Sequence, residues 1–166
     1  MPTTLRIRSH AKINLYLDVL NRREDGFHNI ETIFQTVSLA DELTFTENES
    51  GIELGCSRPD LDTGPENLVC RAAALLQKTT GCARGASIYL EKNIPVAAGL
   101  AGGSGNAAAA LKALNTLWEL NLPDAELRAL ALQLGSDVPY CLVGGTQGAT
   151  GRGEELFPVP PLPETW

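Results

Sequence analysis

The sequence has 166 residues and a mass of 17.7 kDa, enough for one domain but not for two large ones. Hydrophobic residues make up 43% of it and charged residues 20%, as in globular chains with a core. No apolar run reaches the roughly 18 residues of a membrane span, and the net charge of −7 disfavours nucleic-acid binding through a basic face. We expect a cytoplasmic protein, or a stromal one in an organism with plastids, that binds small molecules rather than membranes or nucleic acid.

The cysteines form neither a metal-binding nor a disulfide pattern. No two of them make a C-x-x-C pair, and only His10 and His28 are available to complete a zinc site. We expect reduced, mostly buried thiols, with a structural metal or a disulfide as the alternative. The four cysteines are Cys56, Cys70, Cys82 and Cys141.

The first fifty residues are predicted to form strands. From Lys12 to Leu20, polar and apolar residues alternate with a period of two, which indicates a strand with its apolar side chains on one face. Asp25-Gly26 is a turn signal. Strand patterns follow at 30–37 and, after the polar Asp41, at 42–46.

Helical patterns dominate the second half of the chain. Apolar residues recur at helical spacing after Asn67 and again after the glycine-rich segment, and Gly81 and Gly135 are typical helix stops. The proline-rich end, 158–166, is typical of a linker. The predicted elements are helices at 68–79, 106–120 and 123–135, a strand at 86–91, and strands broken by glycines after Ser136.

A glycine-rich segment, 95–105, precedes the second predicted helix and is called the glycine loop below. Glycines let the backbone approach a ligand closely, and the unpaired first amides of a helix bind anions, so we favour a phosphate site over a loop that merely turns the chain. No lysine follows the glycines, which excludes a Walker A loop. Gly103, Gly105 and Ala108 fit a relaxed dinucleotide pattern, but no acid ends a second strand downstream, so the Rossmann interpretation fails.

Three further segments hold candidate functional side chains. Lys12 and Asn14 project from the same face of their strand. That face is either functional or simply exposed to solvent. Asp137 stands between a helix and an X-Pro kink, where it is either a functional acid or a turn former. His28 follows Phe27 after a turn, and a lone histidine is more often structural or exposed than functional.

Taken together and in this order, 9–15, 23–28, 95–109 and 135–139 resemble the N-terminal part of the GHMP small-molecule kinases. The Ala-Lys-Ile-Asn-Leu and Asp-Gly-Phe-His elements are most similar to members that phosphorylate a CDP-linked methylerythritol in the non-mevalonate isoprenoid pathway. The resemblance runs along nearly the whole chain. It implies an α+β fold like domain 2 of ribosomal protein S5, with a mixed, mostly antiparallel sheet and helices on one side.

The resemblance also implies the roles of individual residues. Asp137 would deprotonate the attacking hydroxyl, and Lys12 would stabilise charge on the phosphoryl group. ATP, with Mg2+ for which no protein ligand is assigned, would be the phosphate donor. The implied substrate contacts are Asn14, Phe27 and His28, and the implied ATP contacts are Asn67, Pro95, Val96, Ala97, Ala98, Gly99, Leu100, Ala101, Gly102, Gly103, Ser104 and Gly105.

Some features depart from the family pattern. The family loop usually reads G-L-G-G-G-S-S, whereas Ala101 and Gly105 stand here for a glycine and the second serine, so a hydroxyl near the phosphates is expected to be lost. We expect 1–157 to form the N-terminal domain and 158–166 a truncated linker, with the family's C-terminal domain absent and the fragment nearly inactive. The alternatives are another GHMP kinase, acting on homoserine or mevalonate, and a non-catalytic S5-like nucleic-acid module.

Overall fold

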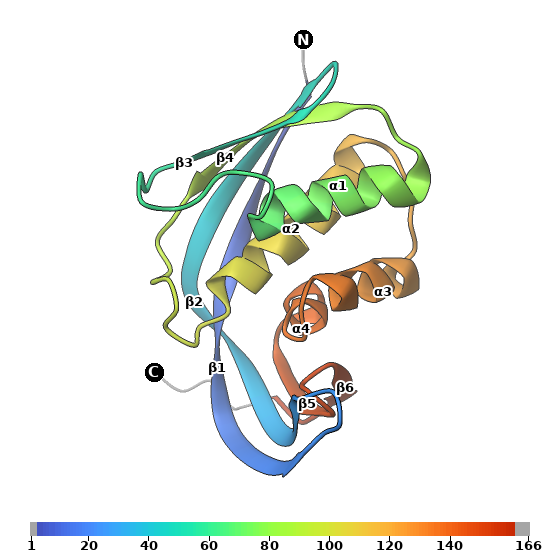
Figure 1. The fold of residues 1–166 in the computed structure, drawn as a ribbon. Coiled ribbons are helices and arrows are strands. Elements are labelled where there is room, and N and C mark those ends of the chain that lie inside the picture. Colours follow the sequence, from blue (N-terminus) through green and yellow to red (C-terminus); the bar gives the residue numbers. More distant parts are fainter. Residues whose placement is uncertain (1–2, 162–166) are drawn as a thin grey trace.

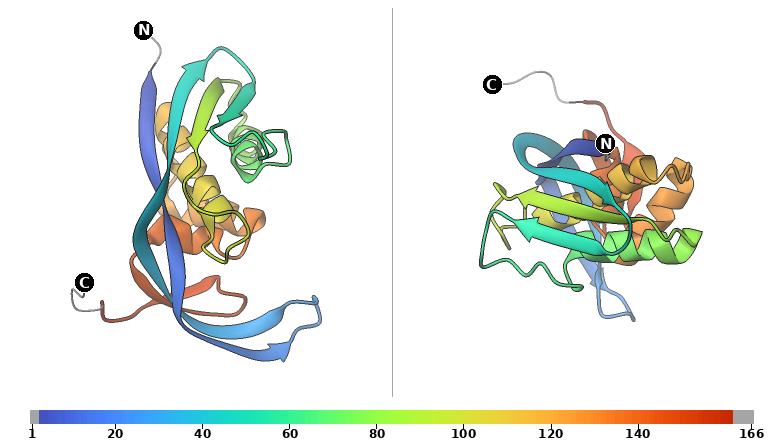
Figure 2. Two further views of the ribbon diagram at one scale, coloured as in Figure 1. Left: turned by 90° about the vertical axis from the view of Figure 1, so that its left-hand side faces the viewer. Right: turned by 90° about the horizontal axis from the view of Figure 1, so that it is seen from above.

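The structure is a computed structural model that describes residues 3–161. These residues form one six-stranded sheet in the order β3-β4-β2-β5-β6, with β1 also paired to β2. Only β3 and β4 run parallel; the other pairs are antiparallel. The helices cover one side of the sheet (Figures 1 and 2), which confirms the predicted α+β class. The strands are β1 (Thr4–Arg22), β2 (His28–Asn48), β3 (Ile52–Cys56), β4 (Gly85–Glu91), β5 (Thr146–Thr150) and β6 (Glu155–Pro158), and the helices are α1 (Leu68–Thr80), α2 (Gly102–Leu117), α3 (Asp124–Leu134) and α4 (Val138–Val143).

The first two strands are longer than predicted and form a curved antiparallel pair. The two strand patterns at 30–37 and 42–46 are one continuous β2, because Asp41 is hydrogen-bonded inside the protein rather than placed in a turn. Residues 15–33 of the pair, called the arm below, extend past the helices (Figure 2).

The predicted facing of β1 is wrong. Its alternating apolar residues, such as Leu15 and Leu17, are 43% and 53% exposed, whereas Lys12 is buried. Two structural features explain this result. The pairing of β1 with β2 shifts register between His10 and Lys12, which turns Lys12 inward, and the arm has no helix against it (Figure 2).

The helices are fixed by local signals that were partly visible in the sequence. Asn67 caps α1 through its side chain, which accepts a hydrogen bond from Val69 N, and Gly81 ends α1 with a left-handed φ of 72°. The central helix α2 begins at Gly102, four residues before the predicted start. Its run of alanines allows close packing between the sheet and the other helices. The core around it includes Leu43, Phe45, Val69, Leu76, Ile88, Leu90, Leu111, Leu114, Trp118 and Val138.

The region after Ser136 differs from the prediction. Val138–Val143 is a short helix, not a strand, because Pro139 fits its first turn, where its missing N–H is not needed. The short strand β3 was not predicted at all. Strand β6 ends at Pro158, one residue past the predicted domain boundary, and the predicted linker residues 162–166 lie outside the described residues. None of the described helices is both long and apolar enough to cross a membrane.

Candidate active site

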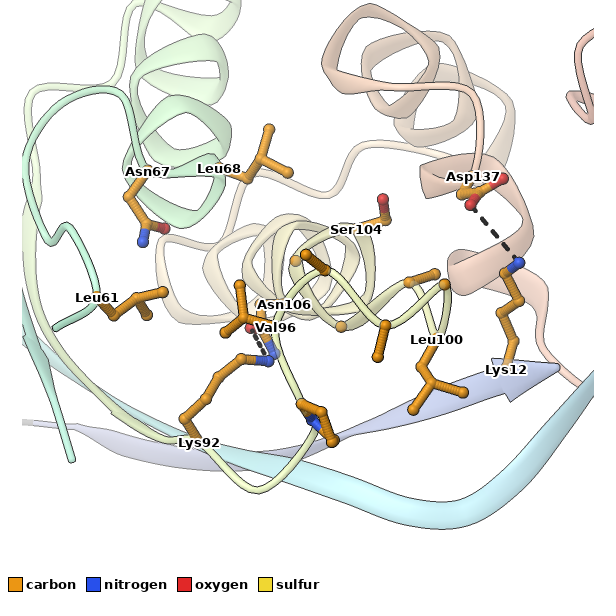
Figure 3. A pocket seen from close by; sticks show the side chains of 17 residues that line it. Lys12, Leu61, Asn67, Leu68, Lys92, Val96, Leu100, Ser104, Asn106 and Asp137 are labelled. Carbon is orange, nitrogen blue, oxygen red and sulfur yellow. Dashed lines mark hydrogen bonds and ion pairs between the residues drawn. The ribbon is translucent and has the colours of Figure 1, made fainter. Parts of the chain in front are cut away.

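A cavity of about 480 Å³ opens between the glycine loop, the start of α1 and the start of α4. The close-up in Figure 3 shows the loop crossing its centre, with Asn67 and Leu68 on one side and Asp137 and Lys12 on the other. We call it the loop cavity. Its lining consists of Lys12, Leu61, Asn67, Leu68, Lys92, all residues from Pro95 to Ser104, Asn106 and Asp137.

The glycine loop has an unusual backbone at three places. Ala97, Gly99 and Ala101 have left-handed φ values of 57°, 74° and 55°. Glycine adopts this conformation freely, but alanine does so at a cost, and such strain persists only where the surroundings hold the backbone in place. A backbone hydrogen bond from Lys12 N to Leu100 O ties the loop to β1.

The end of the loop is the start of α2. The first hydrogen bond of the helix runs from Gly105 N to Ala101 O, so the amides of Gly102, Gly103 and Ser104 precede the helical hydrogen-bond ladder. The helix dipole places partial positive charge at the same point. Because these residues line the loop cavity, the unpaired amides and the positive end of the helix dipole face it, and these local features favour an anion despite the net charge of −7.

Lys12 and Asp137 meet at the edge of the loop cavity. Lys12 Nζ lies 3.9 Å from Asp137 Oδ2, and it donates a hydrogen bond of 2.7 Å to Asn14 Oδ1 (Figure 3 shows the ion pair). Asn14 is held in turn by a bond of 2.7 Å to Thr32 Oγ1, and Lys12 also lies over the Phe34 ring. The lysine is therefore fixed from several sides.

Asp137 is placed by the geometry of α4. Asp137 is the N-cap residue, directly before the first turn of α4, and its side chain makes no capping hydrogen bond within that helix. The Asp137 side chain is about one-third exposed, whereas the Lys12 side chain is only 8% exposed. A lysine ammonium and a partly exposed carboxylate thus face the same cavity, which is the arrangement needed to orient a hydroxyl and balance phosphoryl charge.

Helix α4 also holds a thiol close to this carboxylate. Burial, together with the negative charge of Asp137, raises the pKa of Cys141 to about 12, although Lys12 and Lys112 oppose the shift. The four cysteines are all free thiols. Cys70 is buried as a whole residue, whereas Cys56, Cys82 and Cys141 are partly exposed as residues, although the thiol of Cys141 itself is enclosed enough for burial to raise its pKa.

Not all the candidate residues lie in the loop cavity. Asn14 contacts Lys12 but does not line the cavity, and Phe27 and His28 are exposed near the tip of the arm. Gly105 is on another side of α2, where an added Cβ would lie 2.6 Å from Ser9 Oγ. Gly105 does not line the loop cavity, so the geometry of the cavity gives no support to the expected loss of a hydroxyl near the phosphates at this position.

Asn67 has two structural roles in addition to its place in the cavity lining. Its Oδ1 caps α1, and its Nδ2 donates to Asp62 O at 2.7 Å. Both ends of the amide are therefore engaged within the protein. Its contribution to a ligand would be the shape of the cavity wall that it forms with Leu61 and Leu68 (Figure 3).

Sequence reasoning missed a buried charged pair beside the loop. Lys92 lines the loop cavity with a side chain only 4% exposed, and it forms an ion pair with the fully buried Asp41. Asn106, on the first turns of α2, contacts both residues. The available signal was Asp41, a single acid that interrupts a long strand pattern.

Comparison with known proteins relates these features to a family. Residues 67–145 match the family model described as the GHMP kinases N terminal domain. The chain is 52% identical over 162 residues to 4-diphosphocytidyl-2-C-methyl-D-erythritol kinase of Moorella thermoacetica, covering 98% of this chain and 56% of that protein. The kinase of the same name from Synechococcus sp. (strain JA-2-3B'a(2-13)) is 52% identical over 151 residues, with 91% and 49% covered.

A solved structure agrees with these relatives. The crystal structure of a 4-(cytidine 5'-diphospho)-2C-methyl-D-erythritol kinase superposes with a TM-score of 0.81 at 43% identity, covering 93% of this chain and 55% of that one. The chain therefore spans about half the length of the relatives that it matches. About half of the residues of this chain are identical to those of these relatives, and residues 67–145, which include the glycine loop and Asp137, match the model of the GHMP kinases N terminal domain.

Proposed function

We propose that the chain carries the nucleotide site and the catalytic pair of a kinase that phosphorylates the hydroxyl of 4-diphosphocytidyl-2-C-methyl-D-erythritol with ATP, in the cytoplasm, where ATP is available. The substrate is the one that the names of its relatives indicate. The observation that carries the proposal is the meeting of three groups in one cavity: the free amides at the start of α2, Lys12 and Asp137.

The loop cavity fits a nucleotide triphosphate. A Cβ added at the exposed Gly99 would meet no atom within 4 Å, so the backbone there is open to close approach by a ligand. The amides of Gly102, Gly103 and Ser104 would bind phosphate oxygens, and Ser104 adds a hydroxyl. Mg2+ would bind the phosphates of ATP and keep several of its waters.

The chain's own groups would then act on the hydroxyl and on the phosphoryl charge. ATP supplies the phosphoryl group. Asp137 would accept the proton of the attacking hydroxyl, and Lys12 would stabilise negative charge that develops on the phosphoryl oxygens. Asn14 would hold the Lys12 ammonium in position, since it accepts a hydrogen bond from it. Positioning and charge stabilisation provide most of the catalysis in this reaction class.

The arm would recognise the cytidine part of the substrate. Phe27 is 52% exposed, and Arg152 lies over its ring at 4.5 Å from the centroid, so one ring face is covered and the ring is held in place. We propose that its other face stacks on the cytosine and that His28 hydrogen-bonds the edge of the base. Residues 1–157 would be the N-terminal domain of the enzyme.

A substrate comparison tests this function. The complete gene product is incubated with ATP and either the CDP-linked methylerythritol, mevalonate or homoserine, and product formation is followed. We expect phosphorylation of the first compound and at least a hundredfold lower kcat/KM for the other two. Equal activity on mevalonate or homoserine would contradict the proposed substrate, and the absence of any ATP-dependent product would contradict the kinase itself.

A further inference from the structure

Asp41 is a buried carboxylate with an unusual set of partners. It lies in the middle of β2 and is completely buried. Its Oδ1 accepts hydrogen bonds from the backbone amides of Asn93 and Ile94, each at 2.7 Å, and its Oδ2 accepts one from Asn106 Nδ2 at 2.9 Å and pairs with Lys92 Nζ. A buried carboxylate is costly unless it is paired and hydrogen-bonded, and this one has four donors.

The donors come from the two ends of the glycine loop. Asn93 and Ile94 directly precede Pro95, where the loop begins, and Asn106 lies just after the loop, within the first turns of α2. One side chain of a central strand therefore binds both ends of the loop. Strand β2 is a firm support, because it pairs with β1, β4 and β5.

The same carboxylate also places a cation. The ammonium of Lys92 lies 2.8 Å from the point where a Cβ on Gly102 would stand, so it is next to the first residue of α2. Its Nζ also contacts Asn106 Oδ1 at 3.4 Å (Figure 3). Asp41 thus holds a positive charge beside the free amides of the helix.

We propose that Asp41 is a positioning residue for the glycine loop, which it keeps in a conformation ready to bind a triphosphate. It does not line the loop cavity and would act only through Lys92, Asn106 and the amides before Pro95. The left-handed alanines of the loop give a reason for such a support, because strained backbone persists only where neighbouring contacts enforce it. The proposal rests on the proposed function only in taking a nucleotide as the ligand.

Asp41→Asn tests the proposal with little change in shape. The amide keeps an oxygen for the two backbone donors but places an NH2 group, a donor, against Lys92 or Asn106. In the protein without nucleotide, we expect the hydrogen-bonded amides of Asn93, Ile94 and Gly105 to exchange hydrogen at least tenfold faster, with α1 and α3 unchanged. Affinity for a non-hydrolysable ATP analogue should fall at least tenfold, whereas affinity for adenosine should stay within twofold.

The matched control is Asp18→Asn, the same change at an exposed carboxylate on β1, which should alter neither measurement. Unchanged loop exchange together with an analogue affinity within twofold of the unmodified chain would overturn the proposal. If the unmodified chain binds no nucleotide, the proposed function fails, and the exchange measurement still decides the role of Asp41. If Asp41→Asn does not fold, Asn106→Ala removes one donor; faster exchange at the amides of Ile94 and Gly105 supports the proposal, and unchanged exchange at both overturns it.

Discussion

Lys12 Nζ and Asp137 Oδ2 lie 3.9 Å apart, although Lys12 comes from β1 and Asp137 from the start of α4. The two groups do not use up each other's capacity for hydrogen bonds and charge interactions. Asn14 accepts one hydrogen bond from the ammonium at 2.7 Å, and the side chain of Asp137, which lines the loop cavity, is about one-third exposed. Both groups are therefore held close to each other and can still interact with a ligand.

The first prediction concerns the proposed base. Asp137→Asn should lower kcat of the complete gene product by about 10²- to 10⁴-fold, the usual contribution of a general base. Nucleotide affinity should change by less than about threefold, because the loop amides remain in place. Steady-state kinetics and calorimetry with an ATP analogue measure the two effects. Asp124→Asn, the same change at the first residue of α3, is the control; retention of full turnover by Asp137→Asn would remove the base assignment.

The second prediction concerns the packing of Gly105. Gly105→Ala should lower the free energy of unfolding by about 1 kcal/mol, at the lower end of the cost of overpacking, because the new Cβ would meet the Ser9 hydroxyl. Adding Ser9→Ala should recover most of the loss, since the Ser9 Oγ has no hydrogen-bond partner in the described part of the chain. Urea unfolding of the single and double variants gives the coupling. Strictly additive effects would show that the two residues do not meet.

The third prediction concerns cytosine recognition by the arm. Phe27→Leu should weaken binding of cytidine diphosphate about tenfold, because stacking on an aromatic ring contributes about 1–3 kcal/mol per base. Binding of an ATP analogue should be unaffected, as Phe27 does not line the loop cavity. Leu20→Ala, at an apolar residue of the same arm that is 51% exposed, is the control. Equal losses for the two ligands would mean that Phe27 supports the fold rather than the base.

The fourth prediction concerns the thiol beside Asp137. With its pKa raised to about 12, Cys141 has roughly a thousandth of the thiolate of an ordinary cysteine at pH 8, so iodoacetamide should label it about a thousandfold more slowly. The raised pKa also means that the unfolded state loses this proton first. The free energy of unfolding should therefore fall as the pH rises above about 8.5. Mass spectrometry of labelled peptides, native and in urea, checks the rate; equal labelling in both conditions would contradict it.

Much of the fold could be predicted from local signals. The helices α1 and α3 and the strand β4 follow from periodicity and helix stops, and Gly81 adopts the expected left-handed φ. The facing of β1 could not be predicted, because it depends on a register shift with β2 and on an arm that lacks a helix against it. Both features depend on how β1 pairs and packs in the folded protein, and the periodicity of one strand cannot predict that pairing.

The candidate site, like the fold, could be predicted only in part from the sequence. The glycine loop is visible in composition, whereas the meeting of Lys12 with Asp137 was expected only from the resemblance to a family. Asp41 shows most clearly what the sequence could not predict. A single acid within a strand pattern suggests that the strand ends there, and only the structure identifies the hydrogen-bond donors that allow this acid to be buried within the strand. Those donors lie about fifty or more positions later in the chain.

The proposed function depends most on the loop cavity binding a triphosphate. A crystal structure of the chain with a non-hydrolysable ATP analogue tests this directly. We predict phosphate oxygens within hydrogen-bonding distance of the amides of 102–104, with the terminal phosphate directed toward Lys12 and Asp137. An analogue bound elsewhere, or with its phosphates turned away from the start of α2, would contradict the proposed function.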